Sequence, residues 1–395
     1  ADQTIDDAKN FVEQHFDALT EQLIALAKIP GIAWDAFDAN DLELSAQAVA
    51  KLLEDTNIFD FVEIRKSHID GKPGSPAVVA KRVAKNGKPQ ILLYAHHDVQ
   101  PPGDEDAWLT KPFEPTLKNG RLYGRGAADD KAGIITHLAA IQTLKAIAGA
   151  DFDLGLTIFV EGEEEAGSPT FRNFLDENKA DLEADVIVVA DSGNWTVEVP
   201  ALTTTLRGLV SQVIEVSTLD HALHSGMYGG AVPDAMMASI KLLATLHDDK
   251  GNVAIAGLKQ GKADELAYPE EQLRIDAGLL PNTQQIGDGS ILDRIWTKPA
   301  LTVIGIDGQS VAMSSNTLLP SVKAKISLRI APGEVPEEAL ALLRAHLVAN
   351  LPFGATLNFG ETELGKPFSA VTEGWAKMAA ETALSAGFGQ KSVNI

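Results

Sequence analysis

The segment ILLYAHHDVQPPG, residues 91–103, decides the fold class of this chain. The apolar run ILLYA comes first, His96 and Asp98 follow it, and two prolines and a glycine close the segment. An apolar run that ends in polar residues and turn formers is typical of a buried strand followed by a loop. Polar groups gathered at strand ends are where an α/β fold keeps its chemistry, so the segment predicts a strand with a functional loop behind it.

Further strands and helices are predicted on both sides of this segment. The strand-like runs are AVVAKRVA at 77–84, LGLTIFVEG at 154–162 and ADVIVVAD at 184–191. Helical periodicity marks 5–28, 131–150 and 168–182. Strands that alternate with helices indicate a mostly parallel central sheet flanked by helices on both faces. The predicted fold class is therefore α/β.

The hydrophobic pattern changes after about residue 200. Apolar and polar residues alternate in LVSQVIEVST and SVKAKISLRIAP, which is typical of strands with one face in water. Helical segments flank both runs. We therefore expect an inserted α+β domain over 201–365, and a first domain formed by 1–200 and 366–395. A chain of 395 residues suits two domains.

Composition excludes several classes of function. The formal net charge of −22 argues against nucleic acid or an anionic membrane as a partner. Cysteine is absent, so any metal must be held by His, Asp and Glu. The acidic N-terminus has no basic or apolar region of a signal peptide, and no apolar stretch approaches the roughly 20 residues that span a bilayer. A cytoplasmic protein is predicted.

Three predicted loops carry side chains suited to a paired-metal hydrolase. They contain His96 and Asp98, then Asp129 in GRGAADDKAG, then Glu164 and Glu165 in EGEEEAGS. Residues two apart in a strand point to the same face, so Asp98 can accept the spare imidazole N–H of His96 and fix its tautomer. Adjacent glutamates can divide labour, one binding metal while the other takes a proton from water.

Each of these segments also has an ordinary structural interpretation. The His-x-Asp pair can be a solvated strand end, Asp129 can be a helix N-cap, and the glutamates can form an acidic surface loop. Asp191, at the end of ADVIVVAD, is one more carboxylate at a strand end. Three such segments in this order favour an enzyme over a separate structural explanation for each segment.

Together the segments resemble the M20 metallopeptidases, and most closely the dipeptidase branch that includes the carnosinases. The matching segments run from residue 94 to about 332 and are YAHHDVQPPG, LYGRGAADDKAG, VEGEEEAGS, VVADSGN, LRGL, DHALHSGMYGG and KISLRIAP. The resemblance implies a homodimer that hydrolyses dipeptides or similarly small amides with a di-metal-activated water. It also implies that 201–365 is a lid and dimerisation domain, and that 1–200 with 366–395 is the metal-binding catalytic domain. The alternatives are an N-acyl-amino-acid or succinyl-diamino-acid amidohydrolase, and a non-catalytic peptide-binding homologue.

The resemblance also implies a role for each residue of the cluster. The metal ligands would be His96, Asp129, Glu165 and Asp191. Asp129 would bridge two divalent ions, Glu164 would act as general base and then acid, and Asp98 would orient His96. His97 fills a variable position and is expected outside the ligand set. Zinc suits one imidazole with carboxylates, and manganese or cobalt would also fit.

Three residues of the inserted domain are implied to contact substrate. His224 in LHSGMYGG would reach the active site of the partner subunit and support the developing oxyanion. Arg329 would grip the terminal carboxylate of the substrate with its planar fork, and Thr317 would line the same pocket. The structural alternative for Arg329 is one cation in an exposed stripe, because it lies in phase with Lys323 and Lys325.

The chain departs from the family pattern at its end. The resemblance implies a later glycine-rich substrate loop and a last histidine for the second metal, but the sequence ends at QKSVNI. His346 lies among leucines and is expected to be an ordinary helix residue. The second metal is then left with Asp129 and Glu165, fewer than the three protein ligands usual for zinc. Either the chain is part of a longer protein, which we favour, or it is a shortened and impaired homologue.

Overall fold

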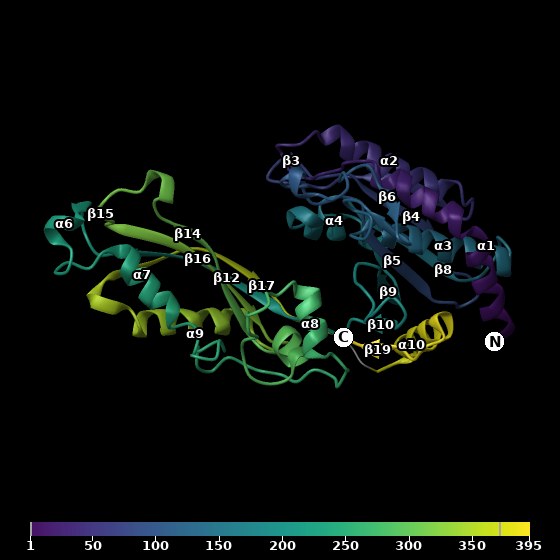
Figure 1. Ribbon diagram of the computed structural model, residues 1–395. Coiled ribbons are helices and arrows are strands. Elements are labelled where there is room, and N and C mark those ends of the chain that lie inside the picture. Colours follow the sequence, from purple (N-terminus) through teal and green to yellow (C-terminus); the bar gives the residue numbers. More distant parts are fainter. Residues whose placement is uncertain (1, 371–372) are drawn as a thin grey trace. The chain divides into compact units, whose positions relative to one another are not determined.

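The chain forms two compact units, Ala1–Gly193 and Asn194–Ile395, each with its own sheet and core (Figure 1). The structure is a computed structural model that describes residues 2–370 and 373–395. The assignment of residues 366–395 to the catalytic domain stays a prediction. Within the described residues, no helix has the length and apolar character needed to cross a membrane.

The first unit is built on a five-stranded sheet in the order β1-β4-β8-β5-β9. The strands are β1 Phe61–Arg65, β4 Ala77–Arg82, β8 Gly155–Glu161, β5 Gln90–His96 and β9 Val186–Val189. The α/β class is confirmed, but the sheet is mixed: β5 runs parallel to β8 and β9, whereas β4 is antiparallel to β1 and β8. The link from β4 to β5 is too short to hold a crossover helix, so these two strands run in opposite directions.

Helices cover both faces of this sheet. They are α1 Asp2–Ala27, α2 Ala39–Glu54, α3 Lys131–Ala148, α4 Phe171–Glu177 and α5 Lys179–Leu182. β8 is buried along its whole length, with Ile158 in the core formed with α1, α2 and α3. Phe159 points to the other face and stacks on Phe174 of α4 with ring centroids 5.0 Å apart. Two short hairpins, β2 His68–Ile69 with β3 Lys72–Pro73 and β6 Thr116–Lys118 with β7 Arg121–Tyr123, complete the unit.

The second unit contains a four-stranded antiparallel sheet in the order β14-β16-β12-β17. The strands are β14 Ala300–Asp307, β16 Ser321–Ile330, β12 Gly208–Ser217 and β17 Thr356–Gly365. Helices α7 Ala235–Ala244 and α9 Pro336–Ala349 pack on its buried face. The two predicted strands and two predicted helices are confirmed. The edge strands β14 and β17 were not predicted, because neither shows a clean alternation of apolar and polar residues.

Smaller elements surround this sheet. The short strands pair as β10 Ala201–Leu202 with β19 Val393–Asn394, β11 Thr205–Leu206 with β18 Phe368–Ser369, and β13 Leu223–His224 with β15 Thr317–Leu318. The remaining helices are α6 Ser225–Tyr228, α8 Glu270–Ala277 and α10 Trp375–Phe388. Figure 1 shows α6 and β15 beyond one end of the four-stranded sheet.

Candidate metal centre

Three strand ends bring the predicted cluster together in the first unit. His96 is the last residue of β5, Glu164 and Glu165 open a short 3-10 helix after β8, and Asp191 follows β9. Because β8, β5 and β9 are parallel neighbours, their carboxyl ends meet at the same edge of the sheet. Asp129 joins them from the loop before α3.

Close packing of α3 against the end of β9 brings the Asp129 loop to this edge. A Cβ added at Gly133 would lie 2.0 Å from the carbonyl oxygen of Ala190, so no larger residue fits there without a shift. Gly133 is in the first turn of α3, and Ala190 directly precedes Asp191. The glycine in DDKAG therefore permits the approach of two carboxylate-bearing segments.

The imidazole of His96 lies at the centre of the cluster and is fully buried. Its Nδ1 is 2.9 Å from the backbone oxygen of Asp98, so Nδ1–H donates to that oxygen. The other nitrogen, Nε2, faces three carboxylates: it lies 3.0 Å from Asp129 Oδ1, 3.6 Å from Glu164 Oε2 and 3.7 Å from Asp191 Oδ2. This tautomer leaves Nε2 available to bind a metal ion.

Asp98 links the imidazole to the glutamate pair. Its side chain is fully buried, and its Oδ1 lies 3.3 Å from His96 Nδ1. The same carboxylate accepts hydrogen bonds from the backbone N–H groups of Glu164, at 3.1 Å, and Glu165, at 2.9 Å. Asp98 thus contacts the imidazole through its backbone oxygen and its carboxylate, and the carboxylate also holds the start of the 3-10 helix. Its orienting role stays a prediction.

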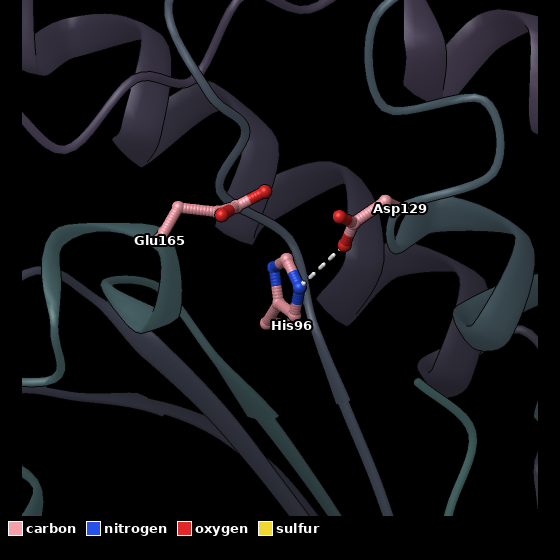
Figure 2. A group of neighbouring side chains, drawn as sticks. All are labelled: His96, Asp129 and Glu165. Atoms are coloured by element: carbon pink, nitrogen blue, oxygen red, sulfur yellow. Dashed lines mark hydrogen bonds and ion pairs between the residues drawn. The ribbon is translucent and has the colours of Figure 1, made fainter. Parts of the chain in front are cut away.

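The cluster offers two sets of three potential metal ligands among the described residues. One is His96, Asp129 and Glu165, and the other is His96, Glu164 and Asp191; within each set the ligand atoms lie within 4.8 Å of one another. Figure 2 shows the first set, with the dashed contact joining His96 and Asp129. Both sets depend on the same imidazole, whose Nδ1 is engaged by Asp98. Only one set can therefore be complete at a time.

The electrostatics of the cluster favour a cation. Burial and the charges of Asp191 and Glu165 raise the pKa of Glu164 to about 7, against the opposing effect of His96. Burial opposes protonation of His96, but the hydrogen bond and charge of Asp98, with the charges of neighbouring carboxylates, raise the pKa of this imidazole to about 10. A divalent ion held by nitrogen and oxygen donors would relieve this repulsion and displace the imidazole proton.

Three neighbours of the cluster were not assigned a part from the sequence. His97 is fully buried, with Nδ1 2.9 Å from Ser45 Oγ and Nε2 2.7 Å from the Pro76 carbonyl oxygen, so its ring points away from the ligands, consistent with its exclusion from the set. Asp130 accepts a hydrogen bond from the His96 backbone N–H at 3.1 Å. Gln100 donates from Nε2 to Glu165 Oε2 at 2.7 Å. The sequence signal for Asp130 was its position next to the predicted ligand Asp129. The signal for Gln100 was its spacing of two residues from Asp98.

The predicted substrate residues lie at two places in the second unit. His224 on β13 pairs directly with Thr317 on β15. Arg329 is exposed and lies near the end of β16. It is eight residues after Ser321, the first residue of the strand, which is about 26 Å along the strand. Arg207 donates hydrogen bonds to the carbonyl oxygens of Arg294 and Lys298, both at 3.2 Å.

Comparisons with known proteins found a matching family and similar proteins. Residues 92–394 match Peptidase family M20/M25/M40. The chain is 36% identical, over 72% of its length and 63% of the relative, to the cysteinylglycine-S-conjugate dipeptidase of Corynebacterium striatum. It is 28% identical, over 80% of its length and 67% of the relative, to the β-Ala-His dipeptidase of Rattus norvegicus.

The fold has a close counterpart among solved structures. Human carnosine dipeptidase 1 superposes with a TM-score of 0.79 at 23% identity, over 98% of this chain and 86% of that one. The chain spans about two thirds of the length of the curated relatives above, 63% of the first and 67% of the second. The family match covers most of the sequence, including every residue of the metal cluster, and the chain therefore belongs to the M20 family of peptidases.

Proposed function

We propose that this chain carries the metal centre of a dipeptidase that hydrolyses dipeptides or similarly small amides. The observation that carries the proposal is the convergence of three carboxylates on the free Nε2 of one buried imidazole, at 3.0, 3.6 and 3.7 Å. Relatives named as dipeptidases for Cys-Gly conjugates and for β-Ala-His support the substrate class.

We assign the first metal ion to His96, Asp129 and Asp191, and the second to Asp129 and Glu165. Zinc is the proposed ion, since one imidazole with carboxylates suits it, and manganese or cobalt also fit the donor set. The second ion has fewer ligands among the described residues than zinc sites usually have. We therefore expect the second ion to bind more weakly than the first.

Bound divalent ions would polarise the scissile carbonyl and lower the pKa of water. Glu164 is the proposed proton carrier, because its Oε2 lies at the cluster, 3.6 Å from His96 Nε2, and a carboxylate in this place can take up and release a proton. Glu164 would take a proton from the attacking water and pass it to the leaving amine. Asp98 holds the Glu164 backbone in place for this transfer.

The second unit supplies the proposed substrate contacts. Arg329 would bind the terminal carboxylate in a bidentate manner, and His224 would support the oxyanion. Thr317, which the resemblance implies lines the Arg329 pocket, pairs with His224 and is therefore proposed to act beside His224. Thr317 precedes the start of β16 at Ser321, and Arg329 lies about 26 Å along the strand from Ser321. This length of strand makes it difficult for both groups to contact one small substrate from the same chain. We propose that His224 and Thr317 serve the site of the partner subunit in a homodimer.

Stepwise metal titration and a substrate panel test the proposed function. Zinc or manganese is added to the metal-stripped chain, and hydrolysis of dipeptides is compared with hydrolysis of N-acetyl amino acids. Metal uptake with turnover of dipeptides above the acylated compounds supports a dipeptidase. Faster turnover of the acylated compounds would indicate an amidohydrolase. Peptide binding without metal uptake or turnover would indicate a non-catalytic binder.

A further inference from the structure

The loop after β5 presents alternate side chains to opposite sides. His96 and Asp98 face the metal cluster. His97, which lies between these two residues, contacts Ser45 and Pro76 instead. Val99, which follows Asp98, is fully buried. This is the alternation of an extended chain. It places the next residue in phase, Gln100, on the cluster side.

Gln100 contacts a proposed ligand of the second ion. Its side-chain amide donates to Glu165 Oε2 at 2.7 Å and also lies 3.4 Å from the Glu165 backbone oxygen. Within the described residues, this is the one hydrogen bond that the Glu165 carboxylate accepts. The distance of 2.7 Å is typical of a charge-assisted bond, so the contact is a strong one.

We propose that Gln100 is a positioning residue that fixes the Glu165 carboxylate for the second metal ion. This inference rests on the proposed function and deepens it. With one oxygen held by a neutral amide, the glutamate loses rotational freedom before the ion arrives, and the hydrogen bond adds no competing positive charge. Asp98 plays the corresponding part for His96, so one extended segment organises ligands of both ions.

The second ion should depend on this contact more than the first. Its proposed ligands are Asp129 and Glu165 alone, so a misplaced Glu165 leaves a single well-placed carboxylate. The first ion has His96 and Asp191 besides Asp129, and none of these three accepts a hydrogen bond from Gln100 among the described residues. Loss of the amide donor should therefore weaken binding of the second ion more than binding of the first.

Stepwise zinc affinities of the full chain, measured by calorimetry with a competing chelator, test the proposal. Gln100→Met removes the donor at similar volume, and Gln100→Glu replaces it with a repelling carboxylate. In Gln100→Met we expect the weaker step to lose 10- to 100-fold in affinity, roughly the effect of removing a partner of a ligand, with the tighter step within about twofold of wild type. Gln100→Glu should lose more. Gln14→Met, on the exposed face of α1, is the matched control.

The possible outcomes separate the inference from the proposed function. Two zinc ions bound by wild type with unchanged affinities in Gln100→Met would overturn the positioning role and leave the dipeptidase proposal intact. Binding of a single ion by wild type would also overturn the positioning role alone. No zinc uptake by wild type would overturn both. Equal weakening of both steps, with the thermal unfolding midpoint unchanged, would show a general effect on the cluster and would overturn the selective role proposed here.

Discussion

Strands β5 and β16 place polar residues in opposite ways. On β16, lysines and Arg329 alternate with buried apolar residues and face water along the whole strand. On β5 and its following loop, the polar residues come at the end, and His96 and Asp98 are fully buried. Solvated charge costs little, whereas buried charge is costly unless it is paired or binds metal. Buried polar groups at a strand end therefore indicate function, and an exposed polar stripe indicates only which face is wet.

The largest effect expected from this contrast is on catalysis. Glu164→Gln removes the proposed proton carrier but keeps the size of the side chain, so kcat should fall by roughly 10²- to 10⁴-fold, the usual contribution of a general base. Glu363→Gln, on exposed β17, should leave kcat unchanged. Steady-state hydrolysis of a dipeptide with bound metal quantified in parallel measures both. Normal turnover in Glu164→Gln would refute the assigned base, and lost metal would mean that Glu164 is mainly a ligand.

A smaller effect is expected on metal binding from the residue that orients the imidazole. Asp98→Asn weakens the hold on His96 and presents an amide group to one of the two backbone N–H donors. Affinity for the first ion should fall by roughly 10- to 100-fold, as for other partners of metal-binding histidines. Chelator competition measures the change. Lys325→Gln, in the exposed stripe of β16, should not alter metal affinity, and a comparable loss there would erase the contrast between the strands.

Two lysines extend the contrast to stability. Lys131 is fully buried, and its Nζ donates to the carbonyl oxygens of Leu26, at 2.6 Å, and Ile29, at 2.7 Å. Lys131→Met leaves both oxygens without this donor, so the free energy of unfolding should fall by about 2 kcal/mol. Lys323 is exposed, and its ion pair with Glu215 is long, with Nζ 3.7 Å from Glu215 Oε2. Ion pairs of exposed lysines contribute little, so Lys323→Met should not measurably change the free energy of unfolding. Urea denaturation measures the free energy of unfolding of both variants. Equal losses in the two would contradict the claim that the buried lysine contributes more to stability than the exposed one.

Much of the fold and of the candidate site could be predicted from the sequence, because the decisive sequence signals are local. The run ILLYA before His96 predicted a buried strand, and the alternation in SVKAKISLRI predicted which residues of β16 face water. The contact between Gln100 and Glu165 could not be predicted, because it joins two loops and depends on where the 3-10 helix begins after β8. The antiparallel placement of β4 was also missed, since strand patterns carry no information about direction.

The smallest expected effect is on pH dependence and compares two histidines. His137 of α3 is buried, with Nε2 2.8 Å from the Tyr94 carbonyl oxygen, and burial lowers its pKa. The unfolded chain therefore binds more protons as pH falls through 6.5, so this group's contribution to stability is present above 6.5 and is lost below it. The loss cannot exceed about 1.4 kcal/mol per pH unit.

The matched substitutions are His137→Gln, which can keep the hydrogen bond to Tyr94, and His346→Gln on α9. Burial also lowers the pKa of His346, but this ring is only half-buried, and it contacts Thr245 at 2.9 Å. Between pH 7.5 and 5.5, His137→Gln should therefore flatten the pH dependence of the unfolding free energy more than His346→Gln does. Equal flattening by both would show that depth of burial does not set the cost of protonating a ring in this fold, and the contrast between the two units would then hold only for the metal cluster.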